Sequence, residues 1–202
     1  MNMKNRFSAA ALAVLLAACT HTTPQTAAGA SSDSQSQSRR DAARAVLDQG
    51  IKAYQAQDYA AALPLFKQAD QLGHMKAARY LGLMVLNGNG MAQSNAQAFA
   101  YFQRAANEGD ITGQYWLGYC YENGIGTTRN YAQAMKWYTQ SARRGDVIAA
   151  PAMVALGHLY EQGKGVPANR NHAAAYYKQA MDAGYEAGKT EWQRLQAAQL
   201  PE

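Results

Sequence analysis

The residues able to do chemistry in the middle of this sequence are few and do not assemble a recognisable site. His74, His158 and His172 stand far apart, without the short spacing that metal ligands usually show. Cys120 lies between two tyrosines and is predicted to be a small buried hydrophobic residue, the alternative being a disulfide to another molecule. No GxSxG, SxxK, HExxH or CxxC motif is present. We therefore predict no catalytic residue, no metal site and no cofactor, and we expect that the protein is not an enzyme.

Composition favours a packed and mostly helical protein. The 202 residues are 48% hydrophobic and include 17 glycines and 13 tyrosines, and two cysteines are too few for a disulfide framework. The formal net charge is +5, and it falls to about +3 when the two positive charges of Lys4 and Arg6 are removed with a leader segment. Without a clustered basic face, that charge does not favour nucleic acid as a partner.

Residues 1–18 are predicted to be a signal peptide. Lys4 and Arg6 precede an apolar run over residues 7–18, which is shorter than the roughly 20 residues that a membrane-spanning helix needs. The sequence from Leu16 to Cys19 reads Leu-Ala-Ala-Cys and resembles the lipobox of bacterial lipoproteins. The alternative is an ordinary signal peptide followed by a chance cysteine.

The lipobox resemblance implies cleavage before Cys19 and lipid attachment, palmitate included, at that residue. Thr20 follows where an aspartate would indicate retention in the inner membrane. The resemblance therefore implies a lipid-anchored protein of the outer membrane that faces the periplasm, with exposure at the cell surface as the other orientation. Residues 19–40 are predicted to be the acylated cysteine and a disordered tether, because small and polar residues dominate them and no large apolar residue appears before Val46.

Internal repetition organises the rest of the chain. Segments 78–110, 114–146 and 153–185 align at offsets of 36 and 39 residues, with the three extra residues near 149–151. Because features recurring at three aligned positions are structural signals, the paired glycines are predicted to form turns and not ligand loops. The shared features are Leu-Gly at 81–82, 117–118 and 156–157, glycine pairs at 88 and 90, 124 and 126, and 163 and 165, and aromatic pairs at 101–102, 137–138 and 176–177.

Each aligned segment is predicted to form a helix, a glycine-containing loop and a second helix. Leu117, Gly118 and Tyr121 fall on one helical face. Gly118 leaves room for the facing Tyr138, because helices that pack 8–10 Å apart need small residues where they meet. Three glycines after the second helices fit left-handed caps, and one proline suits the first turn of an opening helix, namely Gly109, Gly145, Gly184 and Pro151.

These features closely resemble the Sel1-like repeat family, whose units are relatives of the tetratricopeptide repeat. The motif consists of LGxxY, GxG, an alanine with a WY pair, and then alanine and glycine, and it covers residues 78–185. The first unit departs from it at Val85 and Leu86, and the last at Met181. The resemblance implies an all-α fold, a right-handed α/α superhelical solenoid of about four helix-turn-helix units plus a C-terminal capping helix.

The pattern of helical units also predicts how the chain before and after the three aligned segments is divided. Residues 41–75 are predicted to form a tetratricopeptide-like hairpin with Asp58 as a helix N-cap, and Pro64 is expected to kink or delay its second helix. Trp192 and Leu195 are expected to cover the last exposed face. The predicted units are Sel1-like repeat 1 at 76–110, repeat 2 at 111–146 and repeat 3 at 147–185, followed by the capping helix and tail at 186–202.

A binding groove along the opening helices is a further implication of the resemblance. Aromatic, arginine and long apolar residues on an open face suit recognition of a peptide or protein, although several of the apolar ones could instead pack against a neighbouring unit. The groove positions carried over from tetratricopeptide repeats are Arg44, Leu47, Ile51, Tyr54, Lys76, Arg79, Leu83, Leu86, Tyr115, Tyr119, Glu122, Val154, His158 and Glu161.

The favoured function is a membrane-anchored periplasmic scaffold that binds a protein or peptide of the cell envelope. The first alternative is a pilotin-like assembly factor that carries a secretin subunit. An enzyme acting on cell-wall peptides or β-lactams is the less favoured alternative. One branch of the family carries helix-linking cysteine pairs and is tied to penicillin binding, but this chain has no such pairs, so that activity is not carried over. The sequence leaves the oligomeric state open.

Overall fold

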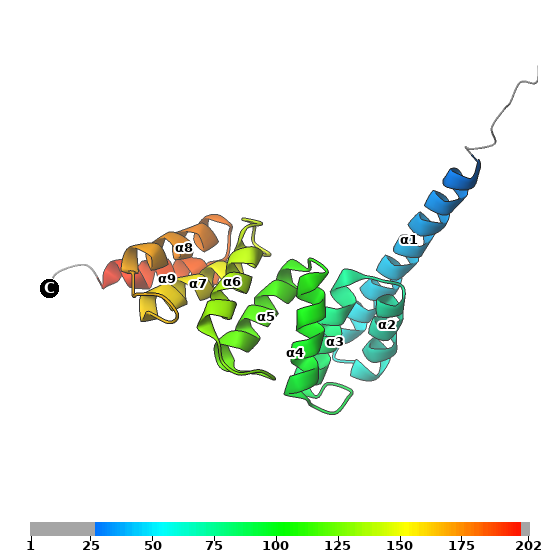
Figure 1. Cartoon of the computed structure of the whole chain (residues 1–202), viewed down its shortest axis with the longest axis horizontal. Helices are drawn as coiled ribbons and strands as arrows, with labels where there is room; N and C mark the ends of the chain where they lie inside the picture. Colours follow the sequence, from blue (N-terminus) through cyan, green and yellow to red (C-terminus); the bar gives the residue numbers. More distant parts are fainter. Residues whose placement is uncertain (1–26, 199–202) are drawn as a thin grey trace, which may run out of the picture.

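The computed structural model describes the backbone of residues 27–198 and the side chains of residues 33–198, so the predicted signal peptide, Cys19 and the start of the predicted tether lie outside it. Within residues 27–198 the chain forms nine α-helices and no strand, which confirms the all-α prediction (Figure 1). The helices are α1 (Ala27–Gln55), α2 (Tyr59–Gln71), α3 (Met75–Asn87), α4 (Asn95–Asn107), α5 (Ile111–Asn123), α6 (Tyr131–Ala142), α7 (Ala150–Gln162), α8 (Arg170–Asp182) and α9 (Glu186–Ala197).

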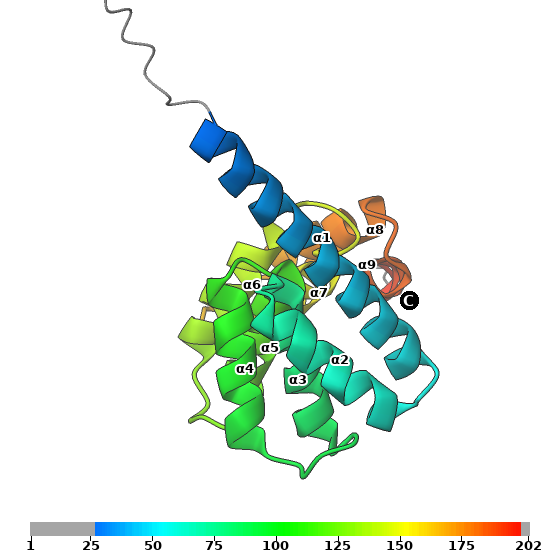
Figure 2. The same ribbon diagram turned by 90° about the vertical axis from the view of Figure 1, so that its right-hand side faces the viewer.

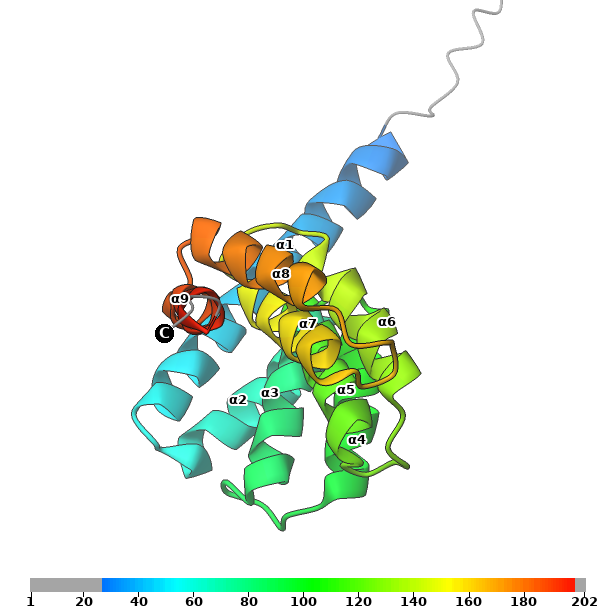
Figure 3. The ribbon, with the colours of Figure 1, turned by 90° about the vertical axis from the view of Figure 1, so that its left-hand side faces the viewer.

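The helices stack in chain order into an elongated solenoid (Figures 1 and 2). Each helix packs against the one before it and the one after it, and α9 also contacts α7, as Figure 3 shows end-on. Pairs α1/α2, α3/α4, α5/α6 and α7/α8 form four hairpins, and α9 covers the end of the stack with its buried Leu195. None of the described helices combines the length and apolar character that crossing a membrane requires.

A glycine in each opening helix lies beneath an aromatic ring of the following helix. A β-carbon added to Gly82 would lie 2.7 Å from the ring of Phe102, and one added to Gly118 would lie 2.7 Å from the ring of Tyr138. Both rings are fully buried. The paired helices reach this separation because the glycines have no side chain, which explains the recurring Leu-Gly. The same contact joins Gly50 with Phe66 and Gly157 with Tyr177.

The paired glycines shape the loops and also join neighbouring units. The first glycine of each pair ends its opening helix in a left-handed conformation, as at Gly124 with φ +71°. The second also has a positive φ, and a β-carbon there would press on the start of the preceding unit's second helix. On Gly90 it would lie 3.0 Å from the backbone oxygen of Tyr59. The glycine pairs are therefore structural, as predicted, and the second glycine has a packing role that the sequence did not indicate.

Two residues predicted to lie at helix starts are confirmed, and one predicted irregularity inside a helix is wrong. Asp58 accepts a hydrogen bond from the Ala61 N–H at 3.0 Å, and Pro151 lies in the first turn of α7, as predicted. The predicted delay at Pro64 is wrong, because α2 begins at Tyr59 and continues through Pro64 to Gln71. A proline removes one backbone hydrogen bond, and burial of Phe66 and its neighbours on the same helix offsets that loss.

Helix α1 extends further toward the N-terminus than predicted. The tether was expected to be disordered through residue 40, but α1 begins at Ala27. Residues 33–42 are all exposed and Ala43 is the first buried side chain, while Arg39 already contacts α2 by donating to the Gln71 carbonyl at 3.1 Å. Elongating a helix costs far less than nucleating one, and Gln37 donates to Asp41 one turn away at 2.9 Å. The polar composition therefore indicated an exposed segment, which is helical instead of coiled.

We predict that Gly82→Ala destabilises the protein by about 1–3 kcal/mol, because the added methyl group overpacks the contact with Phe102. Helix propensity alone predicts the opposite sign, a gain of about 1 kcal/mol. The measurement is the free energy of unfolding in urea, followed by circular dichroism.

Phe102→Leu is the matched background for this test, because the smaller side chain leaves room above residue 82. In that background we expect Gly82→Ala to be neutral or stabilising. An equal loss of stability in both backgrounds would contradict the packing explanation.

Candidate functional site

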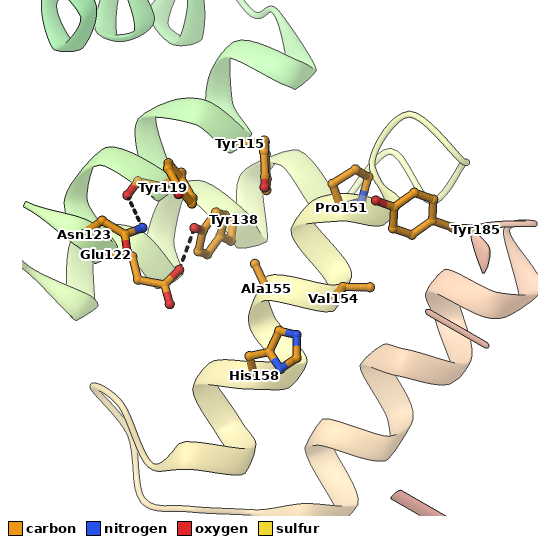
Figure 4. A pocket seen from close by; sticks show the side chains of 10 residues that line it. All are labelled: Tyr115, Tyr119, Glu122, Asn123, Tyr138, Pro151, Val154, Ala155, His158 and Tyr185. Carbon is orange, nitrogen blue, oxygen red and sulfur yellow. Dashed lines mark hydrogen bonds between the residues drawn. The ribbon is translucent and has the colours of Figure 1, made fainter. Parts of the chain in front are cut away.

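A hollow of about 290 Å³ lies between α5 and α7, and tyrosines make up much of its lining (Figure 4). We call it the tyrosine hollow. Figure 4 shows Glu122 and Asn123 at one end and Pro151 with Tyr185 at the other. The lining residues are Tyr115, Tyr119, Glu122, Asn123, Tyr138, Pro151, Val154, Ala155, His158 and Tyr185.

The tyrosine hollow coincides with an irregular step in the repeat. Helix α4 connects to α5 through three residues, 108–110, whereas α6 connects to α7 through seven, 143–149. Tyr115 and Tyr119 of α5 pack against a core cluster that includes Ala152 and Leu156 of α7. The tyrosine hollow lies above this contact, at the step of the stack that has the longest connection of the three described repeats.

A buried hydrogen bond forms one wall of the hollow. The Tyr138 hydroxyl donates to Glu122 Oε2 at 2.7 Å. Burial and the adjacent Glu122 charge raise the pKa of Tyr138 well above its ordinary value, so the phenol remains protonated at neutral pH. Among the described residues, none donates a hydrogen bond to the second carboxylate oxygen, Oε1, and none forms an ion pair with Glu122. The hollow therefore offers a partly buried carboxylate that can accept further hydrogen bonds.

Ring contacts hold the other tyrosines in place. The ring of Tyr115 lies 5.7 Å from that of Tyr138 and 6.4 Å from that of Tyr119, centroid to centroid. Trp116 packs edge-on against both Tyr115 and Tyr119. Burial raises the pKa of Tyr115 to about 12. The wall is consequently a set of packed aromatic rings with limited freedom, a suitable surface for an apolar or cationic group.

A related network closes the neighbouring third repeat. The Tyr177 hydroxyl donates to Glu161 Oε2 at 2.8 Å and lies 2.9 Å from His158 Nδ1. Because the hydroxyl proton goes to the carboxylate, Nδ1 of His158 must donate to the hydroxyl oxygen. Arg194 of α9 donates to the same Glu161 oxygen at 2.5 Å, and this bond lowers the pKa of Glu161 below its ordinary value.

A second hollow, of about 310 Å³, lies beside α3 and α5 and contains a buried ion pair. Arg79 Nε lies 2.7 Å from Asp110 Oδ2, and the two side chains are 12% and 4% exposed. Asp110 also accepts from the Gly113 N–H at 3.0 Å, which makes it the N-cap of α5. Arg79 is thus held by the fold with its charge paired to Asp110, and it still lines the second hollow, so its contact with a partner stays a prediction.

The structure brings five of the predicted groove residues together in the tyrosine hollow. They are Tyr115, Tyr119, Glu122, Val154 and His158. All five lie on α5 or α7, the two opening helices that the longer connection separates. The predicted positions on these two helices therefore share one site, apart from Glu161.

The other predicted positions lie elsewhere. Lys76 joins Arg79 at the second hollow, Arg44 is exposed on α1, and Glu161 is engaged by Arg194. The remaining ones are partly buried and pack against the first or second core cluster, namely Ile51, Tyr54, Leu83 and Leu86.

Leu47 was predicted as a groove residue and is instead part of the core. Its side chain is only 2% exposed and belongs to the cluster that contains Phe66 and Leu81. The apolar stripe of α1 faces α2 and α3, so a partner cannot reach Leu47. The prediction was wrong because one helical stripe can serve either a groove or a core, and only packing distinguishes them.

Sequence reasoning missed half of the lining of the tyrosine hollow. Tyr138 was recognised only as the ring that packs over Gly118, and Pro151 only as a helix-start residue. No pattern indicated that Tyr185 of the last repeat would reach back to α7. These residues meet through the stacking of α5, α6, α7 and the turn before α9, which no local pattern in the sequence indicates. The residues missed are Asn123, Tyr138, Pro151, Ala155 and Tyr185.

The described residues offer little for catalysis. No group of three or more histidine, cysteine, aspartate or glutamate side chains within them is arranged to hold a metal ion. The buried Ser141 hydroxyl is engaged, donating to the Ile111 carbonyl at 2.9 Å. Cys120 is a free buried thiol, and burial raises its pKa to about 12. Its predicted role as a small buried hydrophobic residue is confirmed, and a disulfide to another molecule is excluded while the protein is folded.

The chain belongs to the Sel1 repeat family. The family model described as "Sel1 repeat" matches residues 76–110, 111–146 and 150–185, which together make up more than half of the sequence. Sel1 repeats form a protein-interaction fold, and proteins built from them are generally binding scaffolds without enzymatic activity.

Solved structures show the same fold. A Sel1 repeat protein from Oxalobacter formigenes is similar at 25% identity with a TM-score of 0.65, over 72% of this chain and 58% of that protein. A protective antigen present in uropathogenic Escherichia coli strains, described as displaying an SLR fold, is similar at 28% identity with a TM-score of 0.65. That match covers 77% of this chain and 34% of the antigen. The chain thus spans only part of the length of these relatives. No curated protein matches the sequence.

We predict that Cys120 in the folded protein reacts very slowly with iodoacetamide. A thiol pKa of about 12 leaves a thiolate fraction roughly 1,000-fold below that of a free cysteine, and the reagent has no access to the buried sulfur. The measurement is the alkylation rate of the Cys120 peptide by mass spectrometry, with the protein in guanidinium as the control. Equal rates in the folded and unfolded protein would contradict this assignment.

Proposed function

We propose that this protein is a membrane-anchored scaffold that binds a protein or peptide partner of the cell envelope through the tyrosine hollow. The single observation that carries the proposal is the convergence of phenol rings, a carboxylate and apolar side chains in one open cavity between α5 and α7. Aromatic residues are enriched where protein interfaces derive most of their binding energy. The family supplies the general role, and the hollow supplies a place on this chain where that role can be performed.

The size of the hollow favours a polypeptide partner over a free small molecule. At about 290 Å³ it is at the lower limit of cavities that enclose drug-sized ligands. One or two side chains of a partner fill such a volume, while the partner's backbone passes over the opening. Tyr115 and Tyr119 would contact these side chains, and Val154 with Pro151 would cover their apolar portions.

The proposed anchor is lipid on Cys19, which would attach the solenoid to the outer membrane on its periplasmic side. Support comes from the signal-like leader, the lipobox resemblance and the threonine at position 20. A lipid with several acyl chains binds a bilayer durably, because each buried methylene contributes about 0.8 kcal/mol.

We expect a photo-reactive benzoylphenylalanine at position 119, introduced into the full chain in cells, to form a covalent adduct with a discrete partner. The same group at Gln103, which is exposed on the second helix α4, serves as the control because it lies outside the hollow. The measurement is the set of adduct bands and their identification by mass spectrometry. Identical adducts at both positions, or none at position 119, would refute the hollow as the binding site.

Cys19→Ser tests the anchor separately. We expect the unchanged protein to label with radioactive palmitate and to sediment with outer-membrane vesicles, and the variant to lose both properties because it has no thiol to acylate. Comparing the position-119 adduct of the Cys19→Ser variant with that of the unchanged protein shows whether binding depends on anchoring. Membrane sedimentation of the variant at the original level would overturn the lipid assignment.

A further inference from the structure

Two repeats carry the same tyrosine–glutamate pair with different surroundings. Tyr138 donates to Glu122 at 2.7 Å in the second repeat, and Tyr177 donates to Glu161 at 2.8 Å in the third. Each glutamate lies four residues after the glycine over which the tyrosine ring packs. The two pairs are thus the same structural site, repeated 39 residues apart.

In the third repeat this site is filled by an arginine. Arg194 of the capping helix α9 places its guanidinium Nη2 2.5 Å from Glu161 Oε2 and also bonds Glu191 at 2.8 Å through Nε. The carboxylate therefore receives a hydrogen bond from the tyrosine and another from the arginine. The protein itself shows what kind of group the pair accepts, a guanidinium delivered by the next helix of the stack.

For Glu122 of the second repeat, the residue that corresponds to Arg194 is His158 on α7. Gly113 and Gly188 are equivalent in the stack, because a β-carbon on either would press on an alanine of the preceding helix. Gly113 aligns with Ala152 at the offset of 39 residues, and Ala152 aligns with Gly188 at an offset of 36 residues. The same offset of 36 residues aligns His158 with Arg194. His158 is shorter than arginine and is engaged by the Tyr177 hydroxyl at 2.9 Å. The space that an arginine side chain would occupy beside Glu122 is left as the tyrosine hollow.

We propose that the tyrosine hollow binds an arginine side chain of a separate partner protein, with the guanidinium on Glu122 and its stem against Tyr115 and Tyr119. This inference rests on the proposed scaffold function and names the chemistry that the hollow recognises. Within the described residues Glu122 accepts from Tyr138 alone and forms no ion pair, whereas Glu161 accepts from Tyr177 and also forms an ion pair with Arg194.

Arginine suits the hollow better than lysine for two reasons. Its planar guanidinium forms several hydrogen bonds in fixed directions and also stacks on aromatic rings, whereas the ammonium of lysine is a strongly hydrated point charge. The first repeat lacks the tyrosine–glutamate pair, because it carries Leu86 and Phe102 in place of the glutamate and tyrosine. The first repeat therefore has no carboxylate at this site that could bind a cationic side chain.

The test uses the purified full-length chain in detergent, labelled with 13C in its tyrosine rings, and capped Ala-Arg-Ala as the probe. We expect the arginine peptide to bind at least about 10-fold more tightly than the peptide with citrulline in its place, because citrulline keeps the shape and loses the charge. The lysine peptide is expected to fall between them. Equal binding of the arginine and citrulline peptides would overturn the proposal.

Glu122→Gln is the first variant, since glutamine can still accept the Tyr138 hydrogen bond. We expect it to lower affinity for the arginine peptide to the level of the citrulline peptide. Glu108→Gln is the matched control, because it removes the same charge from an exposed residue outside the hollow, and it should change affinity less than about 2-fold. Unchanged binding by Glu122→Gln would overturn the proposal.

His158→Arg is the second variant, because it reproduces the Arg194 arrangement inside the chain. The new arginine should occupy the hollow and reduce peptide affinity at least about 10-fold. His172→Arg, which introduces an arginine at an exposed histidine outside the hollow, is the matched control and should change affinity less than about 2-fold. If His158→Arg does not fold, the Glu122→Gln and citrulline comparisons still decide the question. Unchanged peptide affinity in a folded His158→Arg would overturn the proposal.

Two outcomes separate this inference from the scaffold proposal. A partner adduct at position 119 together with no preference for arginine would retain the scaffold and refute the arginine site. An arginine preference in vitro with no adduct in cells would retain the site and refute the scaffold role. Sedimentation of the purified protein gives a further control, because self-association lost in Glu122→Gln would identify the occupant as a second copy and overturn the separate partner.

Discussion

An aromatic ring of the second helix lies over a glycine of the first helix in all four described hairpins, and much of the structure depends on this contact. It sets the separation of the paired helices and buries the largest side chains of the core. In the second and third repeats the ring is a tyrosine, and its hydroxyl reaches the carboxylate one helical turn beyond the glycine. The packing contact therefore also positions Glu122 and Glu161, the only described glutamates that accept a hydrogen bond from a buried tyrosine. Tyr138 consequently belongs both to the core and to the lining of the candidate site.

The repeat pattern made the fold predictable, whereas the site was only partly so. Helix-loop-helix units, the glycine turns, the Asp58 cap and the terminal helix all follow from local chemistry that recurs at fixed offsets. Leu47 was misassigned because its burial depends on tertiary contacts with the first core cluster, and the pairing of Arg79 with Asp110 could not be anticipated for the same reason. The role of Arg194 could not be anticipated, since its partner lies 33 residues earlier in the chain.

Two irregularities of the repeat accompany the candidate site. The connection between α6 and α7 has seven residues, and His158 occupies the position that Arg194 occupies at the next step. Neither change alters the packing of rings over glycines, so the stack remains intact while one interface opens. Repeat proteins obtain specific surfaces in this manner, because each unit contacts only its neighbours and a local change is tolerated without loss of the fold.

The N-terminal part of α1 has a mechanical consequence. Residues 27–38 precede Arg39, which bonds the Gln71 carbonyl of α2, and they form a rod of about 18 Å at 1.5 Å per residue. Figures 1 and 2 show this rod pointing away from the stack. An attachment before residue 27 would act on the first hairpin through this rod. The direction of the rod relative to the stack would then affect how the solenoid is tilted.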